Sequence, residues 1–130
     1  MGKRRFTEQA YQNDPWFRAL CSAISACKDE REVADLLRDV GTLSELQAWS
    51  ERLEVAKQLS RGLPYRTVSA HTGASTTTVT RVARFIENGK GGYARFLSYV
   101  KKNADEAKFN TPEEMQKTKT KSESMLKKYL

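Results

Sequence analysis

The sequence has 130 residues, and its 23 Lys and Arg outnumber its 16 Asp and Glu, which gives a formal net charge of +7. This length allows one domain of ordinary size with a tail, and it argues against a catalytic cleft between two domains. Hydrophobic residues make up 38% of the chain, and no apolar run approaches the roughly 18 residues that span a membrane, so we expect a cytoplasmic protein without a membrane partner.

The first two helices are predicted from their N-terminal caps. Asp14-Pro15 is typical of an N-cap followed by proline at the first helical position, and it predicts a helix of about 13 residues. Asp29 and Glu32 have the spacing of a capping box and predict the start of a second helix. Gly41 follows the last apolar residue of that helix, and we expect it to end the helix in the left-handed conformation.

The third helix is predicted to be the longest. Thr42 and Glu45 repeat the capping-box spacing at its start, and Arg61-Gly62 is a typical helix end. Three more helices are expected over residues 65–71, over residues 76–87 and from about residue 93 onward. The chain is therefore predicted to be all-α, with six helices and no credible strand.

Composition divides the chain into three parts. We expect an N-terminal arm over residues 1–12, a helical body over residues 13–102 and a charged, flexible tail over residues 103–130. In the tail the apolar period gives way to Asp, Glu, Lys, Thr and Ser, which bury too little surface to offset the entropy of ordering.

The positive charge is concentrated in the middle of the chain. Residues 48–102 have 10 basic and 3 acidic side chains, whereas residues 1–47 have a net charge of −1 and residues 103–130 a net charge of +1. A solvated basic face is the ordinary explanation of such an excess. Its confinement to one segment favours a surface that binds phosphates.

Residues 65–84 match a helix-turn-helix at its restrictive positions. Such a unit needs an apolar and a small residue on its first helix, a glycine in the turn and apolar residues on the inner face of its second helix. These places are taken by Val68, Ser69, Gly73, Val79 and Val82. An ordinary helical hairpin with a solvated basic side is the alternative.

The second helix of this unit has a polar outer face. Helical spacing that turns its valines inward sends a set of hydroxyl and guanidinium groups outward, where they can contact double-stranded DNA. This set is Thr76, Thr77, Thr80, Arg81 and Arg84. We expect phosphate contacts from Arg66, Ser75 and Lys90, and a protein that is associated with the nucleoid when it binds DNA.

The sequence offers no catalytic or metal-binding motif. His71 is the only histidine and has no nucleophile or carboxylate at a motif spacing. Cys21 and Cys27 are six residues apart without further ligands nearby, so a metal site is not indicated. We expect neither an enzyme nor a metal.

The stretch from Leu46 to Leu97 resembles the Trp repressor family, and most closely its YerC/YecD branch. The resemblance covers residues 13–102 and is most specific over Arg52–Arg84, which contains the run HTGASTTTVTRVAR. It implies a bacterial transcription regulator with an all-α, six-helix fold. The resemblance also implies that this fold interlaces with a second copy as a homodimer, has one helix-turn-helix per subunit and binds palindromic operator DNA.

The resemblance also indicates where an effector would bind. In tryptophan-sensing members the indole of the corepressor lies between two arginines, and the matching positions here are Arg52 and Arg81. The next residue is a glycine in those members and Val82 in this chain. A branched side chain would take up space that the ligand needs, and overpacking typically costs about 1–3 kcal/mol. We therefore expect no tryptophan corepressor and no other cofactor.

The apolar faces of the first three helices are too extensive for a small monomer, and we expect them to form a dimer core. A bundle core within one chain is the alternative. The residues predicted for this core are Trp16, Phe17, Leu20, Leu36, Leu37, Leu46, Trp49 and Leu53.

Two other functions remain as alternatives to sequence-specific DNA binding. A helical adaptor would bind a protein partner, without the steep salt dependence that phosphate contacts produce. An architectural nucleoid protein would bind random and selected duplexes alike.

Overall fold

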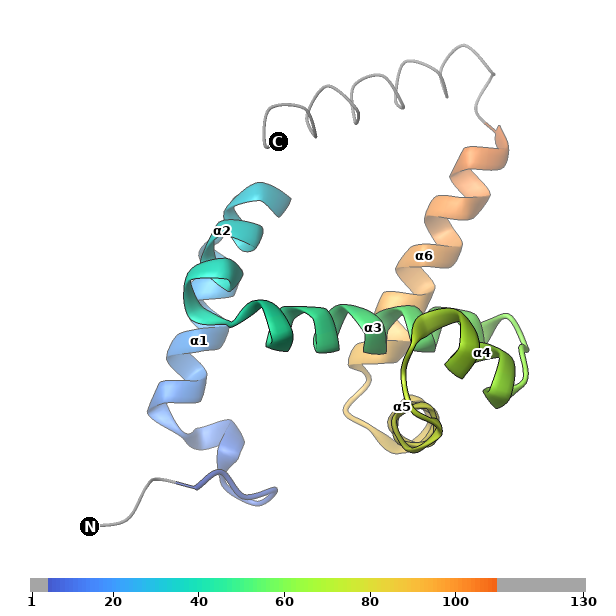
Figure 1. Cartoon of the computed structure of the whole chain (residues 1–130). Coiled ribbons are helices and arrows are strands. Elements are labelled where there is room, and N and C mark those ends of the chain that lie inside the picture. Colours follow the sequence, from blue (N-terminus) through green and yellow to red (C-terminus); the bar gives the residue numbers. More distant parts are fainter. Residues whose placement is uncertain (1–4, 110–130) are drawn as a thin grey trace. The chain divides into compact units, whose positions relative to one another are not determined.

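The computed structural model describes the backbone of residues 5–109 and the side chains of residues 5–105. Within this range the chain has no strand, and all six predicted helices are confirmed (Figure 1). Their bounds, with a short 3-10 helix before them, are η1 (Tyr11–Asn13), α1 (Pro15–Ala26), α2 (Glu30–Val40), α3 (Leu43–Ser60), α4 (Tyr65–Thr72), α5 (Thr76–Asn88) and α6 (Gly92–Phe109).

The predicted caps of α1 and α2 are confirmed. The Asp14 carboxylate accepts hydrogen bonds from the N–H groups of Trp16, at 2.8 Å, and of Phe17, at 3.4 Å. Asp29 accepts from the N–H of Glu32 at 2.9 Å. These bonds satisfy N–H groups that a helix start leaves without an intrahelical acceptor, which explains why both helices begin where the sequence predicts.

The expectation for Gly41 is wrong. Its φ of −102° and ψ of 150° are extended, so no left-handed residue ends α2. A Cβ at this position would lie 3.1 Å from the carbonyl oxygen of Leu37 and 3.2 Å from Cδ2 of Leu46. A side chain at this position would therefore crowd the end of α2 as well as Leu46, and the contact with Leu46 is one that the local sequence pattern does not reveal.

The start of α3 has the reciprocal capping box that Thr42 and Glu45 predict. The N–H of Thr42 donates to Oε1 of Glu45 at 3.0 Å, and the N–H of Glu45 donates to Oγ1 of Thr42 at 3.1 Å. The bond from the Thr42 backbone, with that from its side chain, lowers the pKa of Glu45. At the other end of α3, Gly62 has a φ of +80°, which confirms the predicted left-handed helix end.

The chain divides into an N-terminal unit that ends at Trp49 and a C-terminal unit that begins at Ser50. In the N-terminal unit no residue of α1 or α2 is buried. Trp16 is 67% exposed and Leu20 is 37% exposed. Aromatic edge-to-face contacts join the ring of Phe17 to those of Phe6 and Tyr11. This unit has helices with apolar faces but no core of its own.

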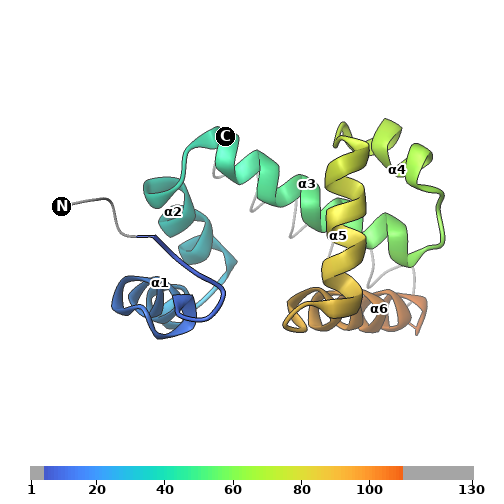
Figure 2. The ribbon, with the colours of Figure 1, turned by 90° about the horizontal axis from the view of Figure 1, so that it is seen from below.

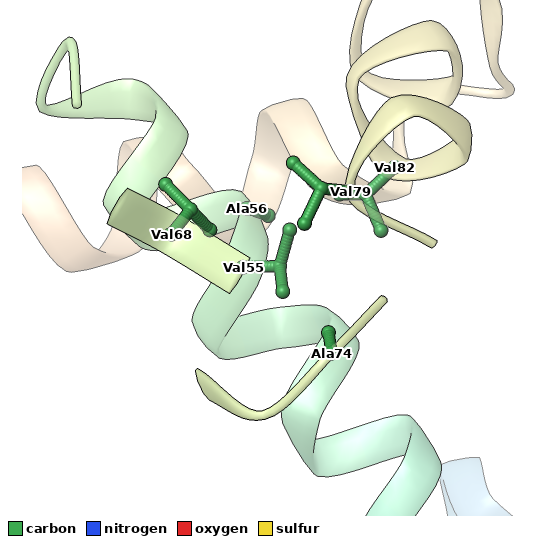
Figure 3. Packing of buried hydrophobic residues seen from close by; sticks show 6 residues of the cluster. All are labelled: Val55, Ala56, Val68, Ala74, Val79 and Val82. Carbon is green, nitrogen blue, oxygen red and sulfur yellow. The ribbon is translucent and has the colours of Figure 1, made fainter. Parts of the chain in front are cut away.

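The C-terminal unit contains the hydrophobic core of the described chain. Six side chains from α3, α4, the following turn and α5 point toward one another (Figure 3). They are Val55, Ala56, Val68, Ala74, Val79 and Val82. Figure 2 shows α5 along its length, with α4 beside its beginning and α6 beside its end. The core thus fixes α5 from one side.

A buried glutamine joins α3 to α4. Gln58 is 9% exposed, its amide Nε2 donates to Oε1 of Glu54 at 3.1 Å, and its Oε1 lies 3.3 Å from Nδ1 of His71. His71 thereby has a hydrogen-bond partner on α3.

Helix α6 continues to Phe109, beyond residue 102, where the predicted body ends. Ala, Glu and Lys between these points favour a helix even though the apolar period has faded. The rest of the predicted tail, residues 110–130, lies outside the described residues, and the predicted domain boundaries stay a prediction.

Candidate nucleic-acid interface

The turn between α4 and α5 has the backbone geometry that the helix-turn-helix prediction requires. Gly73 has a φ of +80° and its N–H donates to the carbonyl of Ser69. The hydroxyl of Ser69 donates to the carbonyl of Ala74 at 2.6 Å, and the hydroxyl of Thr72 accepts from the N–H of Ala74 at 3.2 Å. The hydroxyl of the small Ser69 therefore also stabilises the turn between the two helices.

The inner face of α5 is the predicted one. Val79 and Val82 are buried in the core together with Val68 of α4. Ala83 is half-buried, and Ile86 packs against the same core. The apolar side of α5 thus lies against the protein.

The outer face of α5 is exposed in the part of the chain that the structure describes. The predicted DNA-reading residues are all exposed, which confirms their orientation, whereas their contact with DNA stays a prediction. They are Thr76, Thr77, Thr80, Arg81 and Arg84. The hydroxyl of Thr80 donates to the carbonyl of Thr76 at 2.9 Å, so Thr80 presents its methyl group and its oxygen lone pairs but has already committed its proton.

Ser75 is the N-cap of α5. Its Oγ accepts from the N–H of Thr78 at 3.1 Å and donates to Oγ1 of Thr78 at 3.0 Å. The N–H groups of Thr76 and Thr77 have no intrahelical acceptor, as at every helix start, and they lie at the positive end of the helix dipole. A phosphate at this end would therefore meet backbone N–H groups, with the Ser75 hydroxyl holding the helix start in place.

The other two predicted phosphate contacts are also exposed. Arg66 lies in the first turn of α4, and Lys90 lies in the loop between α5 and α6. Over residues 65–92 the chain has Arg66, Arg81, Arg84 and Lys90 against a single acidic residue, Glu87. The electrostatic potential of this segment favours a polyanion.

One residue of the outer face was missed by the sequence reasoning. Phe85 is 41% exposed, and Cζ of Arg81 lies over its ring, 5.0 Å from the centroid. Residues four apart on a helix are neighbours, so the Arg81–Phe85 spacing was the signal that could have found this contact.

The three residues at the positions that match an effector pocket differ in how exposed they are. Arg52 on α3 is half-buried, Arg81 on α5 is exposed, and Val82 is 1% exposed in the core. Val82 packs with Val55 and Val79. The expected absence of a tryptophan corepressor stays a prediction.

None of the residues predicted for the dimer core is buried within one chain. Four are exposed, namely Trp16, Leu20, Trp49 and Leu53, and four are half-buried, namely Phe17, Leu36, Leu37 and Leu46. Their place in a dimer stays a prediction.

Among residues 5–105, whose side chains the structure describes, no group of three or more His, Cys, Asp or Glu could hold a metal ion. No helix among the described residues is both long enough and apolar enough to cross a membrane.

Comparison with known proteins gives matches over the helical part of the chain. The family model of the Trp repressor protein matches residues 16–101. The protein YerC of Bacillus subtilis (strain 168) is 36% identical over 88 residues, which are 68% of this chain and 85% of YerC.

Two solved structures are similar in fold and in sequence. A TrpR-like protein from Eubacterium eligens ATCC 27750 is 37% identical with a TM-score of 0.63, and the match covers 67% of this chain and 90% of that one. A protein from Staphylococcus aureus, described as a candidate Trp repressor, is 29% identical with a TM-score of 0.66, and the match covers 74% of this chain and 96% of that one.

Proposed function

The chain belongs to the Trp repressor family, in its YerC-type branch, and on this basis we propose that it regulates transcription by binding palindromic operator DNA as a homodimer. Membership of this family indicates a DNA-binding regulator. The operator, the dimer and the residues that contact DNA are parts of this proposal.

The observation that carries the proposal is the two-sided character of α5. Its valines are buried in the core, and its threonines and arginines are exposed on the opposite side. An α-helix fits the major groove, where guanine offers O6 and N7 to the paired N–H donors of an arginine and thymine offers its methyl group. Arg81 and Arg84 are suited to the first contact, and the methyl of Thr80 is suited to the second.

Phosphate contacts would fix the helix in the groove. The exposed start of α5 offers the N–H groups of Thr76 and Thr77, with Ser75 as their cap. Arg66 and Lys90 add positive charge before and after α5. Contacts of this kind position the protein on the duplex, whereas sequence is read by the base-edge contacts.

A second copy is the partner that best covers the N-terminal unit. Helices α1 and α2 of this unit leave Trp16 and Leu20 exposed and contain no buried apolar residue. A twofold homodimer would bury the same apolar faces on both copies and would present two α5 helices to the two halves of an inverted repeat. Dimer formation and palindrome recognition are thus parts of one proposal.

We propose that this regulator does not respond to tryptophan. Val82 belongs to the core beneath the outer face of α5, so the space that a glycine would leave there is filled. Operator affinity should be the same with and without free tryptophan, and a rise of tenfold or more on its addition would contradict this part of the proposal.

Selection of bound fragments from a random DNA pool tests the proposal directly. The expected result is an inverted repeat whose half-sites are about 34–36 Å apart, centre to centre, or a multiple of that distance. The affinity of the selected site should fall steeply with salt. Enrichment without a motif would instead indicate an architectural protein, and no enrichment at low salt would favour the protein adaptor.

A further inference from the structure

The outer face of α5 contains a large aromatic side chain that its core does not need. Phe85 is 41% exposed and is not among the residues that form or cover the hydrophobic core. It lies one helical turn after Arg81, and Cζ of Arg81 is 5.0 Å from the centroid of its ring. On this polar face, the ring of Phe85 thus contacts the guanidinium of Arg81.

A stacked arrangement of this pair would leave the hydrogen-bonding edge of the guanidinium available. A guanidinium over a ring uses its flat face, and its N–H donors lie in its own plane, around the edge. Bidentate binding of guanine O6 and N7 needs that edge. The ring of Phe85 can therefore restrict the Arg81 side chain without competing with a base for its donors.

Restriction matters because arginine is long and flexible. An unrestrained side chain loses rotamer freedom when it binds, whereas one that is held in place in advance loses less. Arg84 provides the contrast on the same helix, since it is also exposed and no aromatic ring is described beside its guanidinium.

We propose that Phe85 is a positioning residue that holds the guanidinium of Arg81 for base reading and thereby contributes to operator specificity. This inference rests on the proposed function, because it assigns Phe85 a part in reading the same DNA. Phe85 acts through Arg81 and needs no contact with a base itself.

The geometry can be tested without DNA. An aromatic ring shifts the NMR signals of groups above its face, so the Nε–H signal of Arg81 in the full free protein should lie upfield of its usual position. It should return there in Phe85→Leu and stay shifted in Phe85→Tyr, which keeps the ring. An Arg81 signal that Phe85→Leu leaves unchanged would overturn the inference and leave the proposed function untouched.

The effect on DNA binding is tested with a double-mutant cycle on the operator selected by the wild-type chain. The cost of immobilising one rotamer-rich side chain corresponds to about a two- to tenfold change in affinity, and we expect Phe85→Leu to weaken operator binding by a factor within that range. Phe85→Leu should cause no further loss in an Arg81→Ala background but the same loss in the matched Arg84→Ala background. Phe85→Tyr should restore binding.

Base preference is a second measurement, and it would not change if Phe85 only stabilised the fold. Phe85→Leu should weaken the base preference only at the operator position whose preference Arg81→Ala abolishes. If Phe85→Leu left affinity and base preference unchanged, or weakened binding equally in the Arg81→Ala background, the proposed role of Phe85 would be overturned and the proposed function would be untouched. Failure of the wild-type chain to select any inverted repeat would instead overturn the proposed function and this inference with it.

Discussion

At the scale of single residues, the exposed basic side chains around α5 fall into two groups. Arg81 and Arg84 lie on the face that would enter a groove, and Arg66 and Lys90 lie outside α5. A base contact carries sequence information and a phosphate contact does not. The two groups should therefore respond differently to the same alanine substitution.

Arg84→Ala should weaken binding to the selected operator by about 1–3 kcal/mol and relax the base preference at one position. Lys90→Ala is the matched comparison, because it should weaken selected and random duplexes alike and reduce the salt slope by about 1. Fluorescence anisotropy over a series of salt concentrations measures both. Equal effects of the two variants on selected and random DNA would contradict the assignment of Arg84 to a base.

Two glycines of the C-terminal unit allow the effect of backbone conformation on stability to be measured apart from the effect of packing. A Cβ would meet nothing within 4 Å at either Gly73 or Gly92, but only Gly73 has a positive φ, of +80°. Gly73→Ala should lower the free energy of unfolding by about 1–2 kcal/mol, because L-residues are strained in the left-handed region. Gly92→Ala should raise it by about 0.4–1 kcal/mol, since alanine suits a helical position. Urea unfolding of both variants measures this, and a destabilised Gly92→Ala would show that packing also contributes.

At the scale of elements, the N-terminus of α5 has two roles, a structural one and a proposed one in phosphate binding. Ser75 caps the helix through the N–H of Thr78, and the same end is where a phosphate would bind. Stability and DNA binding can be separated here because a carboxylate also caps a helix but repels a phosphate.

Ser75→Ala should lower the free energy of unfolding by about 0.5–2 kcal/mol, because the cap is lost. Ser75→Asp should keep the stability, since a negative charge suits a helix N-terminus, yet it should weaken operator binding by at least about fivefold. Thermal unfolding and a DNA titration on the same samples separate the two effects. Full operator affinity in Ser75→Asp would argue against a phosphate at this end of α5.

The elements also show what a sequence can predict. The caps at Asp14, Asp29 and Thr42 depend on groups two to four residues apart, so their spacing was sufficient to place three helix starts. Gly41 was misread because its backbone is extended, and the crowding around it comes partly from Leu46, whose approach depends on how the chain turns between α2 and α3. The orientation of α5 was predicted from helical spacing, whereas the Arg81–Phe85 contact depends on rotamers that spacing alone does not fix.

At the scale of the whole molecule, recognition of an inverted repeat would need two surfaces. The apolar faces of the N-terminal unit would pair two copies, and the polar face of α5 would read the DNA. A single α5 reads only a half-site, so the affinity for an inverted repeat depends on a second copy. A substitution in the N-terminal unit that prevents pairing should therefore weaken operator binding while it leaves the core around α5 in place.

Leu20→Glu tests this coupling, since Leu20 is 37% exposed in one chain and would tolerate a charge there if the protein were a monomer. In a twofold dimer the change occurs on both copies, and loss of each buried leucine removes about 1.5–3 kcal/mol of apolar burial, so we expect the dimer to dissociate. Ser22→Glu adds the same charge to an exposed position on the other side of α1 and is the matched control. Light scattering should give twice the chain mass of 14.8 kDa for the wild type and Ser22→Glu, and 14.8 kDa for Leu20→Glu. Operator affinity should fall only in Leu20→Glu, and a monomeric wild type that still selects an inverted repeat would separate DNA reading from pairing.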